Sequence, residues 1–389
     1  MQYRFTQTIL HSQLLFYIFR LFPIKNNKIV IDNYAGKGFG DNGKYIALEL
    51  LKRNDKNKYD IVWITKDLES HFPKGIRVVP YISLKSIYEQ ATAKIWIDNL
   101  RKAYYIRKRK KQYYIMTWHG GIGPKKIEKE VEDILGKEYV NSAKHDSRMA
   151  DLFLAESDFT YNKYRKFFWY SGEILKCGSP RQDVFFHDNK VIKQKILSSM
   201  GINNYKKIFL YAPTFRDNMS ENDLYIYKRQ WKRILTVVSQ KFGGEWIGFI
   251  RLHPNIAKLD KNRIFEEDYV YDVTNYPDMQ ELLVASDIVL TDYSSCVYDF
   301  GLTGKPGFMI AEDIELYKKQ RDLCLDLNVI PFPIASSDEE LVHIIENFDY
   351  DVYSKKIHDF YYNYCGLYSG GHASEIVCDR IDQIINENM

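Results

Sequence analysis

The chain has 389 residues, more than one hydrophobic core usually supports, so we expect two domains of ~100 to 200 residues each. Its basic residues are nearly balanced by acids, and the formal net charge of +4 says little about binding partners. Five scattered cysteines without a CxxC pair argue against a disulfide framework or a zinc site. No apolar run reaches the ~18 residues that favour a membrane span.

The chain begins with an apolar and aromatic stretch at residues 9–24, which contains His11, Gln13 and Arg20 and lacks a small-residue cleavage site. This pattern predicts an amphipathic segment that either packs on the first domain or lies on a bilayer surface. Seven of the eleven residues at 101–111 are Lys or Arg. Such a loop is most often a solvated face, but near an aromatic N-terminus it favours anionic lipid headgroups. Nucleic acid is not expected, because no recognised nucleic-acid-binding motif accompanies the basic stretch.

Short apolar runs alternate with helical patterns along the chain, which is typical of βαβ units and parallel sheets. The first series predicts strands at 28–33, 59–65, 77–80, 94–98 and 113–117, with helices at 44–53 and 84–92. After a break marked by Gly and Pro at 177–183, a second series predicts strands at 207–211, 246–251, 269–272, 288–291 and 307–310. We therefore expect an α/β protein with two doubly wound, Rossmann-type domains facing a cleft. The expected division is an amphipathic segment at 1–24, domains at 25–180 and 181–365, and a helix at 366–389 that crosses back to the first domain.

Two histidines lie in short turns directly after predicted strands: His119 in TWHGG and His253 in RLHP. Ligands bind at strand ends in open α/β sheets, and an imidazole there can act as a general base, a general acid or a phosphate partner. Because the two histidines lie in different halves of the chain, a shared active site must form in a cleft between two domains.

The transition from strand 288–291 into the following helix favours phosphate binding. Ser294 and Ser295 lie where backbone N–H groups and the positive end of a helix dipole face outward, an arrangement that accepts a phosphate. Helix N-capping by serine is the alternative interpretation.

Two further strand ends carry polar groups of the same kind. Thr214 and Arg216 follow one strand, and Arg216 can bind a phosphate in a bidentate manner or pair with Asp217. Arg251 and His253 alternate on leaving another strand and should project in the same direction. Three such strand ends on one sheet predict a site for a nucleotide diphosphate.

The loop at 36–40 follows a strand and precedes a helix, but its glycine spacing is not GxGxxG. We interpret it as a flexible wall of the cleft, with Gly38 facing an acceptor. Lys125 follows the first histidine turn and either holds an anionic acceptor or lies in a solvated loop.

Six sequence strings occur in order between residues 113 and 376: TWHGGIGPKKIEKE, GSPRQD, YAPTFRDN, RLHP, TDYSSCVYDF and GGHASE. Together they resemble the CDP-glycerol glycerophosphotransferase family, which builds teichoic acids and related phosphate-linked surface polymers. The resemblance implies a GT-B fold and a peripheral enzyme on the cytoplasmic face of a bacterial plasma membrane. Two positions depart from the family pattern: Gly121 stands where threonine is usual, and His372 where an acidic or basic residue is commoner.

The implied reaction transfers glycerol phosphate, or ribitol phosphate in relatives, from a CDP-activated donor to a lipid-linked acceptor and releases CMP. His119 suits the general base, because its ordinary pKa lies near the working pH, and His253 would stabilise charge on the departing CMP. The other expected site residues are Thr214, Arg216, Arg251, Asp292, Ser294 and Ser295 on the donor side, and Gly120, Gly121, Gly38 and Lys125 on the acceptor side. The sequence demands no metal or cofactor.

Two other functions fit the same pattern. A nucleotide-sugar glycosyltransferase would use the same cleft and phosphate-binding helix with a UDP-sugar. A non-catalytic nucleotide-binding or membrane-surface scaffold gives no reason to place both His119 and His253 at strand ends.

Overall fold

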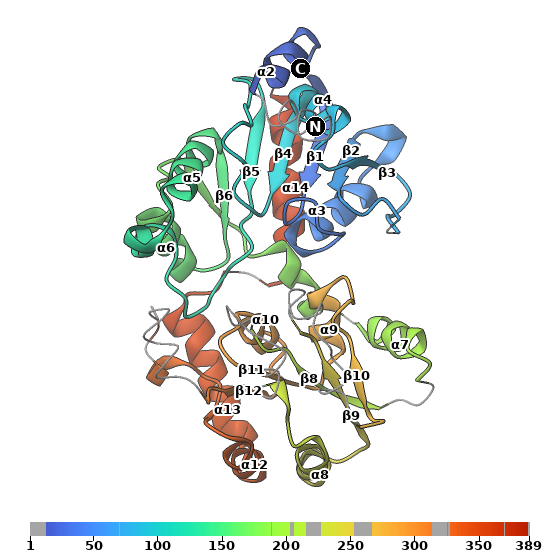
Figure 1. Ribbon diagram of the computed structural model, residues 1–389, viewed down its shortest axis with the longest axis vertical. Helices are drawn as coiled ribbons and strands as arrows, with labels where there is room; N and C mark the ends of the chain where they lie inside the picture. The colour runs from blue at the N-terminus through green and yellow to red at the C-terminus, as the bar shows by residue number, and fades with distance from the viewer. Residues whose placement is uncertain are drawn as a thin grey trace, which may run out of the picture. The chain divides into compact units, whose positions relative to one another are not determined.

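The computed structural model describes residues 13–69, 71–187, 189–202, 206–214, 227–252, 267–312, 325, 327–368 and 370–387 (Figure 1). The chain divides into two compact units. Unit 1 contains the chain up to Gly121, Ile127–Asp183 and Leu367 onward, and unit 2 contains Ile122–Lys126 and Val184–Gly366. Among the described residues, no helix combines the length and the hydropathy that crossing a membrane would require.

The described residues of unit 1 form a seven-stranded parallel sheet in the order β3-β2-β1-β4-β5-β6-β7. The strands are β1 (Lys25–Asp32), β2 (Asp60–Thr65), β3 (Ile76–Pro80), β4 (Ala93–Asp98), β5 (Tyr113–Met116), β6 (Leu152–Ala155) and β7 (Glu173–Lys176). From β1 the chain adds strands first in one direction, to β2 and β3, and then in the other, from β4 to β7, so the strand order reverses between β1 and β4. At this point Asp32 lies opposite Asp98. Such a switch point is where doubly wound sheets bind ligands.

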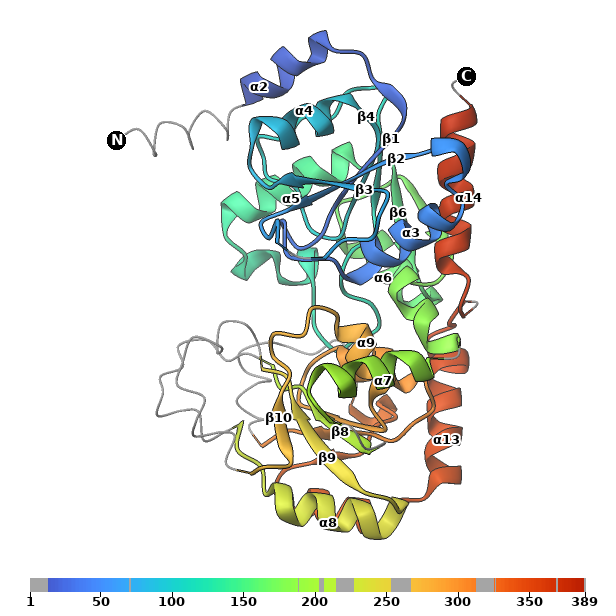
Figure 2. The ribbon, with the colours of Figure 1, turned by 90° about the vertical axis from the view of Figure 1, so that its right-hand side faces the viewer.

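Helices cover both faces of this sheet. They are α2 (Gln13–Ile18), α3 (Asp41–Lys52), α4 (Leu84–Thr92), α5 (Lys137–Met149), α6 (Asp158–Phe167) and α14 (Ala373–Asn386), with 3₁₀ turns η1 (Phe19–Leu21), η2 (Asp55–Asn57), η3 (Glu128–Ile134) and η4 (Pro180–Phe186), which runs on into unit 2. Side chains alternate along β1, so that Ile29 and Ile31 pack with α3 and α14 while Val30 packs with α2 and α4. Figures 1 and 2 show α3 and α14 side by side on the first of these faces.

Helix α14 is fixed to unit 1 at its beginning and along its length. The Asp183 carboxylate accepts hydrogen bonds from the backbone N–H groups of Ala373 and Ser374, at 2.9 and 2.7 Å. These are among the N–H groups that a helix leaves unpaired in its first turn, and a carboxylate there also complements the helix dipole. Further along, the Tyr59 hydroxyl donates to Asp382 at 2.6 Å.

The described residues of unit 2 form a six-stranded parallel sheet in the order β10-β9-β8-β11-β12-β13. The strands are β8 (Lys207–Tyr211), β9 (Trp246–Ile250), β10 (Val270–Asp272), β11 (Ile288–Thr291), β12 (Gly307–Ile310) and β13 (Ile334–Ala335). The helices are α7 (Lys190–Ser199), α8 (Trp231–Phe242), α9 (Met279–Ala285), α10 (Cys296–Gly301), α12 (Asp338–Glu346) and α13 (Tyr350–His358), with turns η7 (Leu327–Val329) and η8 (Asp359–Tyr364). The switch point of this sheet lies between β8 and β11.

The predicted α/β class is confirmed, and the predicted strands agree with the structure within a few residues at their ends. Three strands were not predicted: β6, β7 and β13. Strand β6 is a fully buried apolar run, which periodicity does not separate from a buried helix, while β7 has one buried residue and β13 has only two residues. The helix expected at 44–53 begins earlier, at Asp41, because Gly40 serves as its N-cap.

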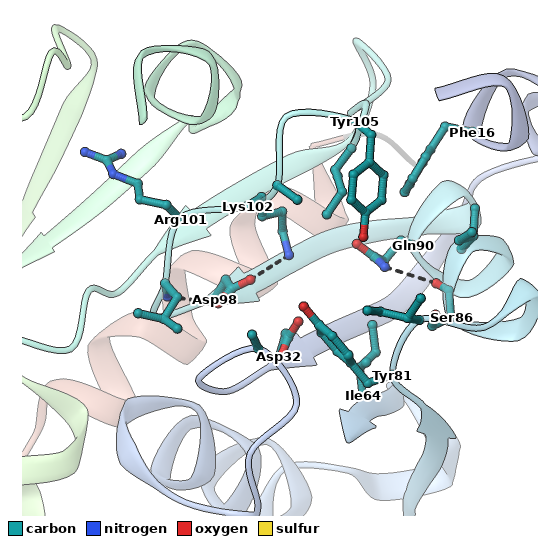
Figure 3. Close-up of a pocket in the computed structure, with 16 residues that line it drawn as sticks. Phe16, Asp32, Ile64, Tyr81, Ser86, Gln90, Asp98, Arg101, Lys102 and Tyr105 are labelled. Atoms are coloured by element: carbon teal, nitrogen blue, oxygen red, sulfur yellow. Dashed lines mark hydrogen bonds and ion pairs between the residues drawn. The ribbon is translucent and has the colours of Figure 1, made fainter. Parts of the chain in front are cut away.

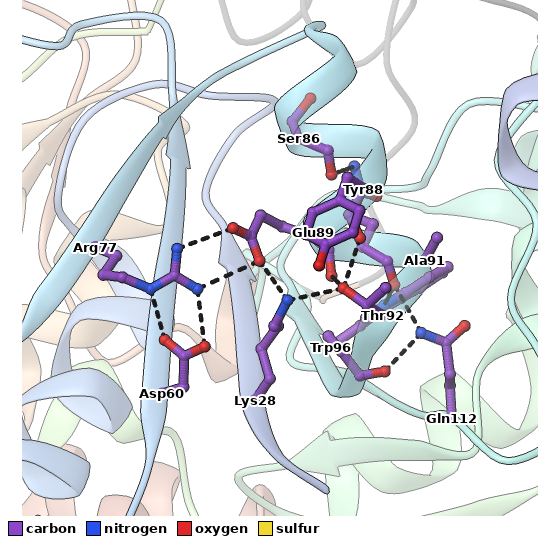
Figure 4. Close-up of polar contacts among 12 residues, drawn as sticks. Lys28, Asp60, Arg77, Ser86, Tyr88, Glu89, Ala91, Thr92, Trp96 and Gln112 are labelled. Carbon is purple, nitrogen blue, oxygen red and sulfur yellow. Dashed lines mark hydrogen bonds and ion pairs between the residues drawn. The ribbon is translucent and has the colours of Figure 1, made fainter. Parts of the chain in front are cut away.

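An ionic cluster, buried at Lys28 and Glu89 and partly exposed at Arg77, joins β1 to α4 (Figure 4). Lys28 Nζ lies 2.5 Å from Glu89 Oε2 and donates to Thr92 Oγ1 at 2.7 Å, and the Lys28 side chain is fully buried. Arg77 bridges Glu89 to Asp60 with distances of 2.8 and 2.7 Å. Burial works against ionisation of Glu89, but hydrogen bonds from Arg77 and Lys28 outweigh it and lower the pKa of Glu89. Glu89 therefore compensates a cation that cannot reach water.

Replacing Glu89 should destabilise the protein strongly. Glu89→Ala leaves the Lys28 ammonium buried without its carboxylate, which typically costs about 3–5 kcal/mol. Chemical denaturation should show this loss in the free energy of unfolding, whereas Glu138→Ala, at an exposed position of α5, should change it by no more than about 0.5 kcal/mol. Equal effects of the two substitutions would contradict the role assigned to Glu89.

Candidate active site

His119 lies in the turn that follows β5, with its ring held by a backbone carbonyl. Its Nδ1 lies 2.9 Å from the carbonyl oxygen of Asn99. Because a carbonyl only accepts, Nδ1 carries the proton and Nε2 keeps its lone pair in the neutral ring. Trp118 packs against the same ring, with 4.5 Å between ring centroids. The turn therefore presents Nε2 as the proton-accepting atom.

Burial lowers the pKa of His119 below its ordinary value. The hydrogen bond to Asn99 and the negative charge of Asp41 oppose this shift, while the positive charge of Arg181 supports it. A lowered pKa keeps the imidazole neutral at physiological pH, which is the form that a general base needs.

Two asparagines at the switch point position the carbonyl that holds His119. Asn99 follows β4 and Asn33 follows β1, and Asn99 Nδ2 donates to Asn33 Oδ1 at 2.7 Å. Asn99 Oδ1 accepts from the backbone N–H of Tyr34 at 2.8 Å. The ends of the two central strands are thus tied together directly beside His119.

Asn42 and Arg181 also hold the histidine turn, through its backbone carbonyl groups. Asn42, in the first turn of α3, donates from Nδ2 to the carbonyl oxygen of Trp118 at 2.9 Å. Arg181 Nη1 donates to the carbonyl oxygen of His119 at 2.7 Å and lies 3.5 Å from Asp41 Oδ2. Both side chains are buried, so the turn is rigidly supported.

Asn33, Asn99, Asn42 and Arg181 were not among the site residues predicted from the sequence. One signal for the first two was present, since both central strands end in the same tripeptide, Ile-Asp-Asn. Arg181 lies in the GSPRQD string, which carried the resemblance but was given no role.

Gly121 leaves room for a buried carboxylate. A Cβ atom at this position would lie 2.1 Å from Glu156 Oε1, closer than any real contact. Glu156 Oε2 accepts from Gln182 at 2.6 Å, so the carboxylate is anchored where it stands. The carbonyl oxygen of Gly120, the residue before Gly121, accepts a hydrogen bond from the Tyr164 hydroxyl at 2.8 Å. A threonine at position 121 would therefore require Glu156 to move.

The other expected acceptor-side residues lie in different surroundings. Gly38 has a φ of +59° and open space where a Cβ would be. Its loop is tied down, because Asn33 Nδ2 donates to the carbonyl oxygens of Lys37 and Gly38 at 2.9 and 3.4 Å. Lys125 belongs to the segment Ile122–Lys126, which groups with unit 2.

The switch point of unit 2 carries a second polar cluster. Asp292, directly after β11, accepts from the backbone N–H and the hydroxyl of Thr214, both at 2.9 Å. Thr214 follows β8, so this pair joins the two central strands of the sheet. Asp292 is 4% exposed, and it positions the Thr214 turn rather than a solvated helix end.

Ser294 and Ser295 lead into the short helix α10. Ser295 makes no side-chain capping bond, and Ser294 Oγ accepts from the N–H of Cys296 at 3.4 Å. Arg251 leaves β9, and its Nη1 lies 3.3 Å from the sulfur of Met279. Arg216 and His253 lie outside the described residues.

The basic stretch at 101–111 is only partly a surface. The Arg101 side chain is only 5% exposed and pairs with Glu128 and Asp146 at 2.9 and 3.1 Å. Lys102 is buried against Asp98 at 2.6 Å. The interpretation of all seven basic residues as one lipid-facing loop is therefore wrong, because tertiary contacts recruit the first two into the interior. Lys110 and Lys111 are exposed.

Among the side chains that the structure describes, no group of three or more His, Cys, Asp or Glu residues is arranged to hold a metal ion. At the two switch points, Asp98 pairs with Lys102, and Asp292 accepts from the backbone N–H and the hydroxyl of Thr214.

The family model for CDP-glycerol:poly(glycerophosphate) glycerophosphotransferases matches residues 14–383. The chain is 28% identical over 393 residues to a teichoic acid poly(glycerol phosphate) polymerase of Bacillus spizizenii, and the match covers 97% of each. It is 31% identical over 320 residues to the teichoic acid glycerol-phosphate primase of Bacillus subtilis, covering 79% of this chain and 78% of that protein. It spans about half the length of a related polymerase from Staphylococcus epidermidis, at 52%.

Solved structures show the same architecture. The wall teichoic acid polymerase TagF matches with a TM-score of 0.83 and 26% identity, over 100% of this chain and 99% of that one. Another TagF structure, obtained after a soak with CDPG, matches equally well at 25% identity. The likeness to an MnaA–UDP structure of S. aureus, at a TM-score of 0.53 and 13% identity, concerns the fold alone. The expected GT-B-like fold class is thereby confirmed, and the chain belongs to the CDP-glycerol:poly(glycerophosphate) glycerophosphotransferase family.

Proposed function

We propose that this enzyme transfers glycerol phosphate from CDP-glycerol to a lipid-linked acceptor in the synthesis of teichoic acid or a related surface polymer. The observation that supports this most strongly is the fixed tautomer of His119, whose Nδ1 is bonded to Asn99 so that Nε2 is the basic atom. Ribitol phosphate from CDP-ribitol is the alternative, because relatives include a teichoic acid poly(ribitol-phosphate) polymerase at 27% identity.

In the proposed reaction, an acceptor hydroxyl attacks the phosphorus that bears the glycerol. As the new O–P bond forms, the hydroxyl proton passes to His119 Nε2, and the bond to the bridging oxygen breaks so that CMP leaves with the electron pair. Asn99 stabilises the imidazolium, because its carbonyl continues to accept from Nδ1. Arg181, bonded to the His119 carbonyl, keeps the turn from relaxing during this transfer.

The donor is proposed to bind at the switch point of unit 2. The Thr214 turn, the Ser294–Ser295 segment and Arg251 supply hydroxyl, backbone N–H and guanidinium donors near the ends of three strands. Asp292 would orient this set through Thr214. The proposal also assigns His253 and Arg216 to the diphosphate.

A membrane-facing surface is proposed at the N-terminal helix. The exposed apolar side chains of α2 and the turn after it include Leu14, Leu21 and Phe22, at 63, 86 and 46%. The basic stretch meets this segment directly, since Arg109 Nη1 donates to the carbonyl oxygen of Phe22 at 2.7 Å. Apolar side chains beside exposed Lys and Arg are typical of surfaces that bind anionic bilayers. Such a surface would hold the enzyme at the cytoplasmic face of the membrane, where a lipid-linked acceptor is present.

The donor preference tests the proposed function. Incubation with CDP-glycerol, CDP-ribitol or UDP-sugars, together with a lipid-linked acceptor, should release CMP from CDP-glycerol and extend the acceptor by a mass of glycerol phosphate. Release of UDP alone would favour a nucleotide-sugar glycosyltransferase. A mass increase of ribitol phosphate would support the alternative donor.

Removing the proposed base should abolish turnover without abolishing donor binding. His119→Gln should lower kcat by ~10² or more, because the amide cannot accept the proton, while CDP-glycerol binding by calorimetry stays close to that of the natural enzyme. His358→Gln, an exposed histidine on α13, serves as the matched control. In the natural enzyme, activity should fall with acidification only below the ordinary histidine pKa, because burial favours the neutral, active ring. Normal kcat in the His119 variant would rule out its role.

The membrane surface can be tested with two substitutions. Leu21→Glu and Phe22→Glu remove apolar side chains that would be buried in the headgroup region, and each should weaken binding to phosphatidylglycerol vesicles about 10-fold or more. Leu68→Glu alters another exposed leucine of unit 1, at 56% exposure, and should leave binding unchanged. Vesicle flotation at low and high salt measures both. Equal binding of all variants would remove this segment from the proposed surface.

A further inference from the structure

A small polar cavity lies at the switch point of unit 1, between the ends of β1 and β4 and helix α4 (Figure 3). Its volume is about 40 Å³, which exceeds the ~10–15 Å³ that one water requires. Its walls combine apolar side chains, including Phe16, Ile64 and Ile87, with polar ones, including Asp32, Asp98, Lys102, Gln90, Tyr81 and Tyr105. We call this cavity the Asp32 pocket.

Two cations line the pocket beside Asp32 and Asp98, and both are paired with other carboxylates: Lys102 with Asp98, and Arg101 with Glu128 and Asp146. Lys102 Nζ is bonded to Asp98 Oδ2 at 2.6 Å, so the lysine is already paired. Asp32 lies opposite Asp98 in register, and its Oδ1 accepts from the backbone N–H of Gly36 at 2.8 Å. Burial and the charge of Asp98 raise the pKa of Asp32 to about 7, against the opposing effect of Lys102. A hydrogen-bond donor supplied by a ligand would relieve this unfavourable environment.

Gln90 provides a second acceptor directed into the same space. Its side chain reaches the pocket from α4, and the residue is 7% exposed (Figure 3). Nε2 donates to the carbonyl oxygen of Ser86 at 3.3 Å, whereas Oε1 has no hydrogen-bond partner. Buried amide oxygens are nearly always paired, and each unpaired one calls for an explanation.

Tyr81 closes the pocket from the loop after β3. Burial, followed by the charge of Asp32, raises the pKa of Tyr81, which favours the protonated hydroxyl. In Figure 3 the Tyr81 hydroxyl lies close to Asp32 and faces the same space as Lys102 and Gln90. Its ring packs so closely on the loop that a Cβ at Gly36 would lie 2.8 Å from Tyr81 Cγ. The aromatic wall is therefore fixed in place.

We propose that the Asp32 pocket binds a neutral vicinal diol, whose two hydroxyl groups donate hydrogen bonds to the Asp32 carboxylate and to Gln90 Oε1. Its carbon atoms would lie against Ile64, Ile87 and the Tyr81 ring. The neighbouring carboxylates of Asp32 and Asp98 disfavour a phosphate monoester of the same diol.

The pocket adjoins the proposed catalytic histidine through the two Ile-Asp-Asn strand ends. Asp32 and Asp98 face the pocket, and the next residues, Asn33 and Asn99, form the amide pair whose backbone holds His119. A diol in the pocket would therefore lie next to the element that positions the base. The binding of a neutral diol to the pocket is independent of the proposed function. The identification of this diol as the terminal polyol of the acceptor rests on the proposed function.

Saturation-transfer NMR on the full chain at pH 8, where Asp32 is largely ionised, tests the binding with glycerol and ribitol as probes. Glycerol 3-phosphate is the charged comparison. At least one of the neutral polyols should bind saturably, ~10-fold or more tightly than the phosphate ester, both to the natural protein and to His119→Ala. Asp32→Asn and Gln90→Met should each weaken polyol binding ~10-fold. The inference is overturned if neither polyol saturates, if the phosphate ester binds as well, or if these variants bind normally.

Tyr81→Phe and Tyr88→Phe form a matched pair, because both remove one hydroxyl and only Tyr81 lines the pocket. The first should weaken polyol binding several-fold and the second should not. Thermal unfolding of each variant identifies any that fail to fold. If Asp32→Asn is among them, Gln90→Met and the tyrosine pair still decide the question.

CMP release in the same preparations separates this inference from the proposed function. With a lipid-linked acceptor, Gln90→Met should raise the acceptor KM ~10-fold and leave the KM for CDP-glycerol unchanged. Polyol binding without CMP release from CDP-glycerol would contradict the proposed function and leave the pocket standing. CMP release with an unchanged acceptor KM in Gln90→Met would overturn the assignment of the pocket to the acceptor.

Discussion

The hydrogen bond between Asn33 and Asn99, at 2.7 Å, is the interaction on which the candidate site depends. It joins the ends of the two central strands at the point where the sheet changes direction, and Asn99 passes this constraint to His119 through its backbone carbonyl. A doubly wound sheet leaves a crevice at this point, because the connecting loops diverge to either side. The Asn33–Asn99 pair fixes the backbone at this point, and the Asn99 carbonyl holds the His119 ring in one tautomer.

In unit 2 the ends of the two central strands are also joined by side chains, but by different chemical groups. There the switch point is closed by a carboxylate and a hydroxyl, as Asp292 accepts both the N–H and the hydroxyl of Thr214. Short polar side chains at the ends of central strands satisfy one another in both units. The proposed reaction assigns the base to unit 1 and the phosphate-binding donors to unit 2.

The departure at Gly121 has a physical explanation in the neighbouring chain. Glu156 occupies the space that a side chain at position 121 would need, and Gln182 holds it there. A buried carboxylate thus stands beside the histidine turn, in the space that a side chain at position 121 would need. Position 121 and position 156 are therefore expected to vary together among related chains, because one volume serves both.

The sequence by itself determined the described strands other than β6, β7 and β13, the helices α3 and α4, and the position of His119, because each follows from the pattern of apolar residues over a few consecutive positions. The resemblance of six short strings was sufficient to identify the family. Local pattern also placed Thr214 and Asp292 at strand ends.

Only the tertiary structure decided which of these polar groups act together. Register across the sheet sets Asp32 opposite Asp98 and Asn33 beside Asn99, although more than 60 residues separate the members of each pair. Tertiary contacts likewise show that the basic stretch is not one exposed surface, because Arg101 pairs with Glu128 on η3 and Asp146 on α5. Charge and hydrogen bonding act through space over a few ångströms, and a linear sequence does not state which distant residues come that close.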